Sequence, residues 1–287
     1  MGSAPDLLCS LALIALTAGL VLALAAAGAG AEVGGAFTEA SLRALGKRVL
    51  GPTARRLVAA GISANMVTAF SLGLGLGSAV LLGAGRFGVA SVLMVLASLG
   101  DAMDGLVARE SRTATAGGAL FDASVDRYEE SALLGALAIY FRDQVALMAL
   151  ALLALLGSYM VSYGSAKAEA LRVRVPGGIM RRGARAACLC VGCTLVPVSG
   201  WVATRYGLAA WVGTAPVVLS LAAMAGLGNI SAILRLRVIA MAGSIPQSTL
   251  ASPPRGHDEG AATATSPQAV SPVDSQPAPV RVVEADA

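Results

Sequence analysis

The chain has 287 residues, of which 56% are hydrophobic and 13% are charged, and its formal net charge is +4. Soluble domains carry about 25% charged residues, so the composition argues against an ordinary soluble domain and indicates a membrane protein. The basic residues lie in the connections between apolar runs and leave no free basic face. The sequence therefore predicts no nucleic-acid partner.

The apolar runs approach the ~20 residues that cross a bilayer as a helix. They cover residues 7–30, 66–85, 87–104, 118–140, 145–164, 186–204 and 207–228. The ~10-residue alternation of a membrane β-barrel is not visible in the sequence. The pattern predicts an all-α membrane protein: a six-helix transmembrane bundle, preceded by an interfacial amphipathic helix and by one extra N-terminal spanning helix.

The N-terminal region has two parts. Residues 1–36 contain the extra hydrophobic helix, which starts near Asp6 and lacks the positive n-region of a signal peptide. The alanine- and glycine-rich stretch 27–31 leaves a cleaved segment as the alternative. Residues 37–60 separate apolar and basic positions at helical spacing, which predicts a helix lying in the membrane interface. An ordinary cytoplasmic loop helix is the alternative there.

The composition changes to Ser, Pro, Ala, Thr and acidic residues after about residue 244. Such a segment cannot bury enough apolar surface to fold, so we expect a membrane domain over 37–243 and a disordered cytoplasmic tail over 244–287. Lys and Arg concentrate in alternate connections, which by the positive-inside rule face the cytoplasm across the inner membrane. These connections are 43–56, 109–127 and 167–185.

Four aspartates form the pattern D-x2-D-G-x2-A-R-x8-G-x3-D-x3-D. Asp101 and Asp104 share one helix face, and Asp122 and Asp126 share a face of the next helix. The short connection predicts that these helices are antiparallel neighbours, with both pairs at the cytoplasmic end. Carboxylates gathered there repel one another unless a cation intervenes. An all-oxygen set selects Mg²⁺ or Mn²⁺, and four carboxylates are enough for two ions.

Three residues between the aspartate pairs suit a phosphate ligand. Gly105 and Ala108 leave room for a ligand against the helix backbone, and Arg109 is able to clamp phosphate oxygens. Each alone has a structural alternative, since small residues are common in such helices and Arg109 fits a positive-inside anchor. Hard ions on carboxylates usually serve phosphate chemistry, so together with the aspartates these residues favour phosphate binding.

The stretch from Asp101 to Asp126 resembles the signature of the CDP-alcohol phosphatidyltransferases at all eight of its fixed positions. The wider resemblance covers about residues 40–240. It implies metal-dependent transfer of a phosphatidyl group from CDP-diacylglycerol to an alcohol, with release of CMP, by a homodimer in the bilayer. It also implies that Asp126 is the general base for the acceptor hydroxyl. The implied ligands of two metal ions are Asp101, Asp104, Asp122 and Asp126.

The resemblance also assigns contacts with the CDP moiety. The positions that match such contacts in relatives are Asn65, Met66, Val67, Thr68, Gly105, Ala108, Arg109 and Thr115. Ala64 stands where relatives commonly have proline, in the turn before the first of these segments.

The region after the aspartates is similar to the acceptor site of actinobacterial phosphatidylinositol phosphate synthases. There a Tyr-x-Lys-Ala-Arg-Ala-Glu run and an Arg-x-x-Arg pair bind the acceptor phosphate. This chain keeps Arg182 and Arg185, whereas Ser165 replaces the lysine and Lys167 replaces the arginine of the run. The resemblance implies that Lys167, Arg182 and Arg185 bind a phosphorylated acceptor of the inositol phosphate type.

Two alternatives concern the acceptor side. Glycerol 3-phosphate suits the same charges, which would make the chain a phosphatidylglycerophosphate synthase. The three cations also fit plain positive-inside residues.

Two further alternatives come from other classes of protein. A polytopic cation- or proton-coupled transporter uses intramembrane carboxylates as a relay, but it often has inverted repeats. Here the carboxylates cluster near one membrane face and no repeat is visible. A non-catalytic membrane scaffold has no need of metal-spaced aspartates. The sequence therefore favours an enzyme.

Overall fold

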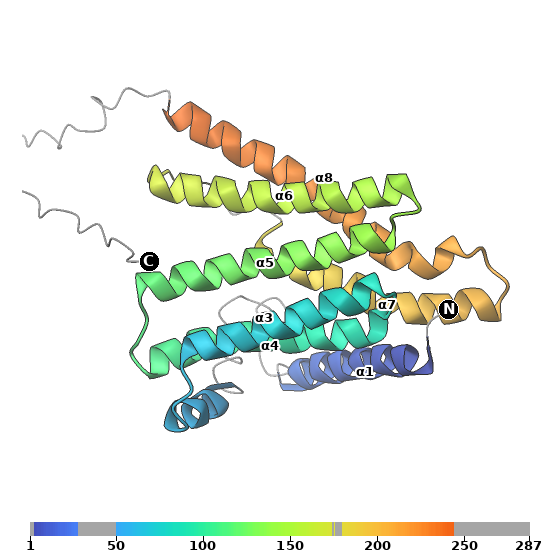
Figure 1. Ribbon diagram of the computed structural model, residues 1–287, viewed down its shortest axis with the longest axis horizontal. Helices are drawn as coiled ribbons and strands as arrows, with labels where there is room; N and C mark the ends of the chain where they lie inside the picture. The colour runs from blue at the N-terminus through green and yellow to red at the C-terminus, as the bar shows by residue number, and fades with distance from the viewer. Residues whose placement is uncertain (1–2, 28–49, 174, 176–179, 244–287) are drawn as a thin grey trace, which may run out of the picture. The chain divides into compact units, whose positions relative to one another are not determined.

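The computed structural model describes residues 3–27, 50–173, 175 and 180–243. Every regular element in this part of the chain is an α-helix (Figure 1). The helices are α1 (Ala4–Ala27), α3 (Ala64–Gly83), α4 (Phe87–Glu110), α5 (Ala116–Tyr140), α6 (Val145–Ala170), α7 (Arg182–Arg205) and α8 (Trp211–Gly243). A further helical segment covers residues 50–59.

Five of these helices, α3, α4, α6, α7 and α8, are long and apolar enough to cross a membrane. The chain is therefore an integral membrane protein. α5 has 25 residues and packs against α3 and α6, although the charges near its beginning lower its hydropathy. α3 to α8 form the predicted six-helix bundle, and α1 packs against α4 and α7.

The packing of α4 and α5 differs from the prediction. α4 packs mainly against α3 and less extensively against α1 and α7, and α5 packs mainly against α3 and α6. Among the described helices, α4 and α5 are not a closely packed pair, so the prediction of direct neighbours was wrong at the level of the backbone. α3 packs against both helices, and carboxylate side chains reach across the space between α4 and α5. That space belongs to the site described below.

The apolar core lies in the half of the bundle away from the aspartates. Leu82, Leu134 and Leu137 are fully buried there. The Tyr140 ring stacks edge-on against Phe87 and against Phe141, with ring centroids 4.9 Å apart in each pair. Because lipid tails are as apolar as leucine, close packing rather than removal from water holds such helices together. This packed half fixes the helices that carry the site.

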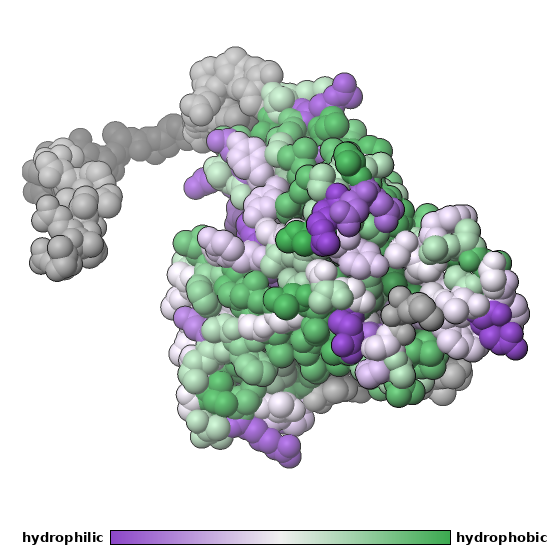
Figure 2. All heavy atoms as spheres, turned by 45° about the vertical axis from the view of Figure 1, so that its right-hand side comes forward, coloured by the Kyte–Doolittle hydropathy of each residue, from purple (hydrophilic) through white to green (hydrophobic). Residues whose placement is uncertain are grey.

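Large apolar side chains are exposed on the outside of several helices, including Phe70, Val80 and Leu219. Figure 2 shows apolar residues over much of one face, with hydrophilic residues in separate patches. Exposed apolar surface of this extent marks a membrane-contacting surface. It agrees with the membrane assignment from helix length.

The segment 50–59 covers the end of α4 nearest the site. Ala54 is buried against Met103 and Val107, and Leu57 packs beside them. This segment is the described part of the amphipathic helix predicted over 37–60; the remainder falls outside the described residues. The chain divides into the units Met1–Ser244 and Ile245–Ala287. The predicted disordered tail, 244–287, also lies outside the described residues.

Candidate functional site

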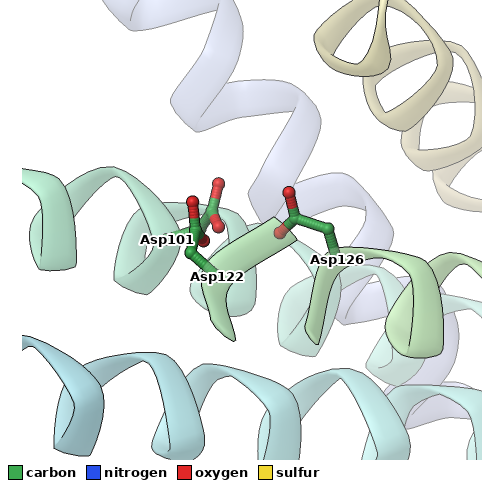
Figure 3. A group of neighbouring side chains, drawn as sticks. All are labelled: Asp101, Asp122 and Asp126. Atoms are coloured by element: carbon green, nitrogen blue, oxygen red, sulfur yellow. The ribbon is translucent and has the colours of Figure 1, made fainter. Parts of the chain in front are cut away.

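Three aspartates converge between α4 and α5. One carboxylate oxygen from each of Asp101, Asp122 and Asp126 lies within 4.8 Å of the others. Figure 3 shows Asp101 reaching from α4 toward Asp122 and Asp126, which project from successive turns of α5. The i, i+4 spacing places the α5 pair on one face, as the sequence predicted. We call these three residues the aspartate trio.

The trio suits a hard divalent cation. Oδ1 of Asp122 and Oδ1 of Asp126 are buried and have no hydrogen-bond partner. A buried acceptor without a partner costs about 1–3 kcal/mol, so a ligand that satisfies both atoms is favoured. Carboxylate oxygens are the donors that Mg²⁺ and Mn²⁺ prefer. The donor set therefore fits the predicted kind of metal.

Arg182, at the start of α7, supplies positive charge to the trio. Its Nη2 donates to Oδ1 of Asp101 at 3.2 Å, and its Nη1 pairs with Oδ2 of Asp126. It joins α7 to both helices that carry the trio. Arg182 was predicted as an acceptor ligand, and its guanidinium lies beside the predicted base.

Asp104 takes a different position from the trio. It is buried, and its Oδ2 accepts a hydrogen bond of 2.6 Å from Oγ1 of Thr68 on α3. Asp104 and Asp122 both line a cavity of about 390 Å³, which we call the α3/α5 cavity. The four predicted aspartates thus form three converging carboxylates and a fourth on the wall of the adjoining cavity.

The α3/α5 cavity gathers most of the residues matched to nucleotide contacts. Those on its wall are Asn65, Thr68, Gly105, Ala108, Arg109 and Thr115. A Cβ on Gly105 would lie 3.5 Å from Nη1 of Arg109, an ordinary contact distance, so the Arg109 guanidinium lies against the helix at this position. Ser63 and Thr115 cap the N-terminal ends of α3 and α5 at the same cavity. Helix N-termini favour anions, so this cavity suits a phosphate-bearing ligand.

Two of the matched residues lie away from this cavity. Met66 is largely exposed, and Val67 packs against the cluster of Ala54, Met103 and Val107. Consecutive residues of a helix point in different directions, so the segment 65–68 presents only Asn65 and Thr68 to the cavity. Ala64 begins α3 directly after the cap Ser63, a position where proline is also common.

A second cavity, of about 480 Å³, opens on the other side of the trio. We call it the arginine-lined cavity. Its wall includes Asp126, Arg181, Arg182, Arg185 and Arg235. The trio therefore separates two cavities, with Asp122 bordering the first and Asp126 bordering the second.

The predicted acceptor residues differ in their surroundings. Arg185 is only 2% exposed; its Nε and Nη2 donate to the two carboxylate oxygens of Glu130 at 2.7 and 2.9 Å, and its Nη1 donates to Met180 O at 3.0 Å. The Arg185 guanidinium therefore links Glu130 on α5 to the backbone just before α7. Lys167 is exposed and is not on the wall of this cavity.

Among the charged residues of this cavity that the predicted site did not include are Glu130 and Arg235. Glu130 lies four residues after Asp126, so the i, i+4 spacing that joined Asp122 to Asp126 also extends to it. Arg235 lies within the apolar helix α8 and hydrogen-bonds to Oγ of Ser165. Its charge in a largely apolar helix was the signal available in the sequence. Ser165 stands where the Tyr-x-Lys-Ala-Arg-Ala-Glu run of the related synthases has lysine, and here it binds an arginine from another helix.

The family model for CDP-alcohol phosphatidyltransferase matches residues 61–245. Phosphatidylinositol phosphate synthase of Corynebacterium glutamicum is 35% identical over 139 residues, 47% of this chain and 64% of that protein. The synthase of the same name from Mycobacterium marinum is 31% identical over 187 residues, 63% of this chain and 76% of that protein. The chain thus spans slightly less than two thirds of the length of the first of these relatives.

Solved structures of Mycobacterium tuberculosis phosphatidylinositol phosphate synthase have the same fold. The structure with CDP-DAG bound has a TM-score of 0.58 and 24% identity, and covers 67% of this chain and 94% of the other. The structure in complex with manganese and citrate has a TM-score of 0.59 and 24% identity, and covers 67% and 89%.

Proposed function

This chain belongs to the CDP-alcohol phosphatidyltransferase family, and we propose that it transfers a phosphatidyl group from CDP-diacylglycerol to a phosphorylated alcohol, with release of CMP. The proposed acceptor is of the inositol phosphate type. The observation that carries the proposal is the position of the aspartate trio between two cavities of different character.

The α3/α5 cavity is the proposed donor site. Two helix N-termini and Arg109 suit the diphosphate of a CDP-lipid. Asn65 and Thr115 offer polar groups to the cytidine part, and Gly105 lies on the same wall. The M. tuberculosis relative was solved with CDP-DAG bound, which supports this assignment by analogy of fold.

The arginine-lined cavity is the proposed acceptor site. Arg182 and Arg235 face it from α7 and α8, and arginine forks suit a phosphate monoester. Arg185 acts there through Glu130 and Met180, by fixing the start of α7. This revises the direct phosphate contact that the resemblance implied for Arg185, and it leaves Lys167 at the periphery.

We infer that Asp101, Asp122 and Asp126 hold a divalent cation, Mg²⁺ or Mn²⁺, and that Asp104 with Asp122 supports a second. When bound, such ions neutralise the diphosphate and stabilise the leaving CMP. The relative solved with manganese and citrate supports metal binding in this fold.

The remaining chemistry belongs to the chain's own side chains. Asp126 lines the acceptor cavity, so its carboxylate is placed to accept the proton of the acceptor hydroxyl. The acceptor oxygen forms a bond to the phosphatidyl phosphorus as the bond from that phosphorus to CMP breaks. Arg182 holds the carboxylate of Asp126 in place through Oδ2.

The proposed location is the inner membrane, with the site facing the cytoplasm. The basic connections on the site side support this orientation through the positive-inside rule. Homodimer formation, which the family resemblance implied, is a further proposal. The mass of the detergent-solubilised protein tests it.

The decisive experiment measures CMP release by the purified full chain with CDP-diacylglycerol, Mg²⁺ or Mn²⁺, and a panel of acceptors. The panel contains inositol phosphate, glycerol 3-phosphate and the corresponding unphosphorylated alcohols. We expect release with inositol phosphate only. Release with glycerol 3-phosphate alone would show that the acceptor is glycerol 3-phosphate and that the reaction class is as proposed. No release with any acceptor, from folded protein that binds metal, rejects the enzyme and leaves the transporter alternative.

A further inference from the structure

An ion pair joins α1 to the bundle at the end opposite the aspartate trio. Asp6, in the first turns of α1, is only 1% exposed, and its Oδ2 accepts a hydrogen bond of 2.7 Å from Nε of Arg86. Oδ2 also accepts a bond of 2.6 Å from the Ser3 hydroxyl, and Oδ1 accepts one of 3.3 Å from the Val89 amide. A buried charge is retained only where it is paired and hydrogen-bonded, and Asp6 meets both conditions.

The backbones of the two helices approach closely at this point. A Cβ on Gly88 would collide with the backbone of Asp6. Ser10 and Leu13, one and two turns farther along α1, are also buried. Three observations from separate residues thus agree that α1 is docked along α4, with a defined register.

The ion pair fixes the direction of α1. Arg86 precedes the first residue of α4, whereas Asp101 and Asp104 lie in its last turns. α1 and α4 therefore start at the same end of the bundle and run side by side toward the aspartates (Figure 1). α1 has 24 residues, about 36 Å at 1.5 Å per residue, which exceeds the ~30 Å of the hydrocarbon core.

We propose that α1 is a retained seventh membrane-crossing helix, whose N-terminal end lies on the membrane face opposite the site and is locked there by the Asp6–Arg86 pair. Loss of α1 leaves the Arg86 guanidinium, 42% exposed in the pair, without its carboxylate. The pair has no part in the proposed chemistry, so the inference stands whether or not the proposed acceptor is correct.

The direction of α1 is tested by epitopes at the two ends of the full chain. Arg235 borders the arginine-lined cavity, so α8 ends on the site side. We expect the N-terminal epitope and the C-terminal epitope to be accessible from opposite sides of sealed membrane vesicles. The mass of the purified chain should include residues 1–27. Epitopes on the same side, or a mature chain without these residues, overturn the proposal.

The contribution of the Asp6–Arg86 pair to stability is tested by a double-mutant cycle, with melting temperature in detergent as the readout. Asp6→Asn and Arg86→Gln should each lower the melting temperature by several degrees, because each leaves a charged partner behind. The double variant should lose less than the sum of the two single losses. If the two single decreases in melting temperature simply add in the double variant, or if Asp6→Asn causes no decrease, the proposed role of the pair is wrong.

The chain offers a matched control at the same end of the bundle. Arg142 and Asp143 approach to 3.9 Å but are 66% and 86% exposed. Exposed pairs contribute little, so Arg142→Gln and Asp143→Asn should leave the melting temperature unchanged, singly and together. If the single variants of the Asp6–Arg86 pair do not fold, the epitope experiment still decides the direction of α1.

Discussion

Arg182 and Arg185 lie one helical turn apart on α7, yet their partners give them separate tasks. Arg185 donates to both oxygens of Glu130 and to the Met180 carbonyl from a buried position. Arg182 pairs with Asp101 and Asp126 at the boundary of two cavities. A sequence motif that contains both residues does not distinguish them, because the difference arises from which acid each one reaches.

Replacing Arg185 should affect stability first. Arg185→Met leaves Glu130 without its partner, and breaking a buried pair in this way costs about 3–5 kcal/mol. We expect a clear fall in melting temperature. Adding Glu130→Leu should recover part of it, because the second change removes the unpaired carboxylate. Arg182→Gln is the contrasting variant: it should lower the melting temperature less than Arg185→Met, because its side chain is 43% exposed, and it should raise the KM for the phosphorylated acceptor. Equal effects of the two arginines on KM would contradict this division.

Asp126 belongs to the aspartate trio and also lines the arginine-lined cavity, so its replacement should separate binding of the CDP-lipid from turnover. Asp126→Asn should lower the rate of CMP release by about 10²–10⁴-fold, the usual contribution of a general base. Affinity for the CDP-lipid should change little, because the α3/α5 cavity is lined by other residues. Steady-state kinetics and lipid-binding titrations measure the two effects. Asp143→Asn is the control, and wild-type turnover in Asp126→Asn would exclude the proposed base.

At the scale of the elements, α3 holds the two site helices at a fixed separation. It packs against both α4 and α5, and a Cβ on Gly100 of α4 would collide with the Ser71 hydroxyl of α3. Gly100 directly precedes Asp101. A small residue at this position therefore sets how near one ligand of the aspartate trio stands to the others.

Enlarging Gly100 should disturb both packing and activity. Gly100→Ala is expected to cost about 1–3 kcal/mol of stability, as overpacking does, and to slow CMP release by moving Asp101. Adding Ser71→Ala removes the colliding hydroxyl and should recover much of both losses. Gly135→Ala is the matched control, since no atom lies within 4 Å of a Cβ built there. Melting temperature and CMP release, measured for these three variants and the wild type, test this expectation.

The helices were predictable because each apolar run is long enough to form one. The run 66–85 became α3 (Ala64–Gly83), and 118–140 became α5 (Ala116–Tyr140). The run 87–104 stopped short of the true end of α4 at Glu110, because the charged site residues continue the helix without continuing its hydropathy. The partner of Asp104 and the separation of α4 from α5 depend on α3, which the spacing of the aspartates does not encode.

At the scale of the whole molecule, the site is a concentration of negative charge that folding brings together. Asp101 comes from α4, Asp122 and Asp126 from α5, and Arg182 from α7. In the unfolded chain these helices are apart, so a ligand of the assembled trio binds the folded state alone. Such a ligand stabilises the protein by mass action.

Divalent metal should therefore raise the melting temperature of the full chain in detergent. We expect Mn²⁺ or Mg²⁺ to increase it in a concentration-dependent way, and a chelator to lower it while abolishing CMP release. The metal-dependent increase should disappear in Asp122→Asn and persist in Asp143→Asn, whose carboxylate is exposed at the other end of the bundle. A melting temperature that does not respond to metal would contradict the assignment of the trio.

The separation of the two cavities by the aspartate trio has a stereochemical consequence. A donor in the α3/α5 cavity and an acceptor in the arginine-lined cavity occupy different space, so both are able to bind before any bond changes. In the proposed reaction, the acceptor approaches the phosphorus from the side opposite the departing nucleotide. A single in-line displacement of this kind inverts the configuration at phosphorus, and initial-rate plots intersect rather than run parallel. A phosphatidylated enzyme intermediate would instead give net retention.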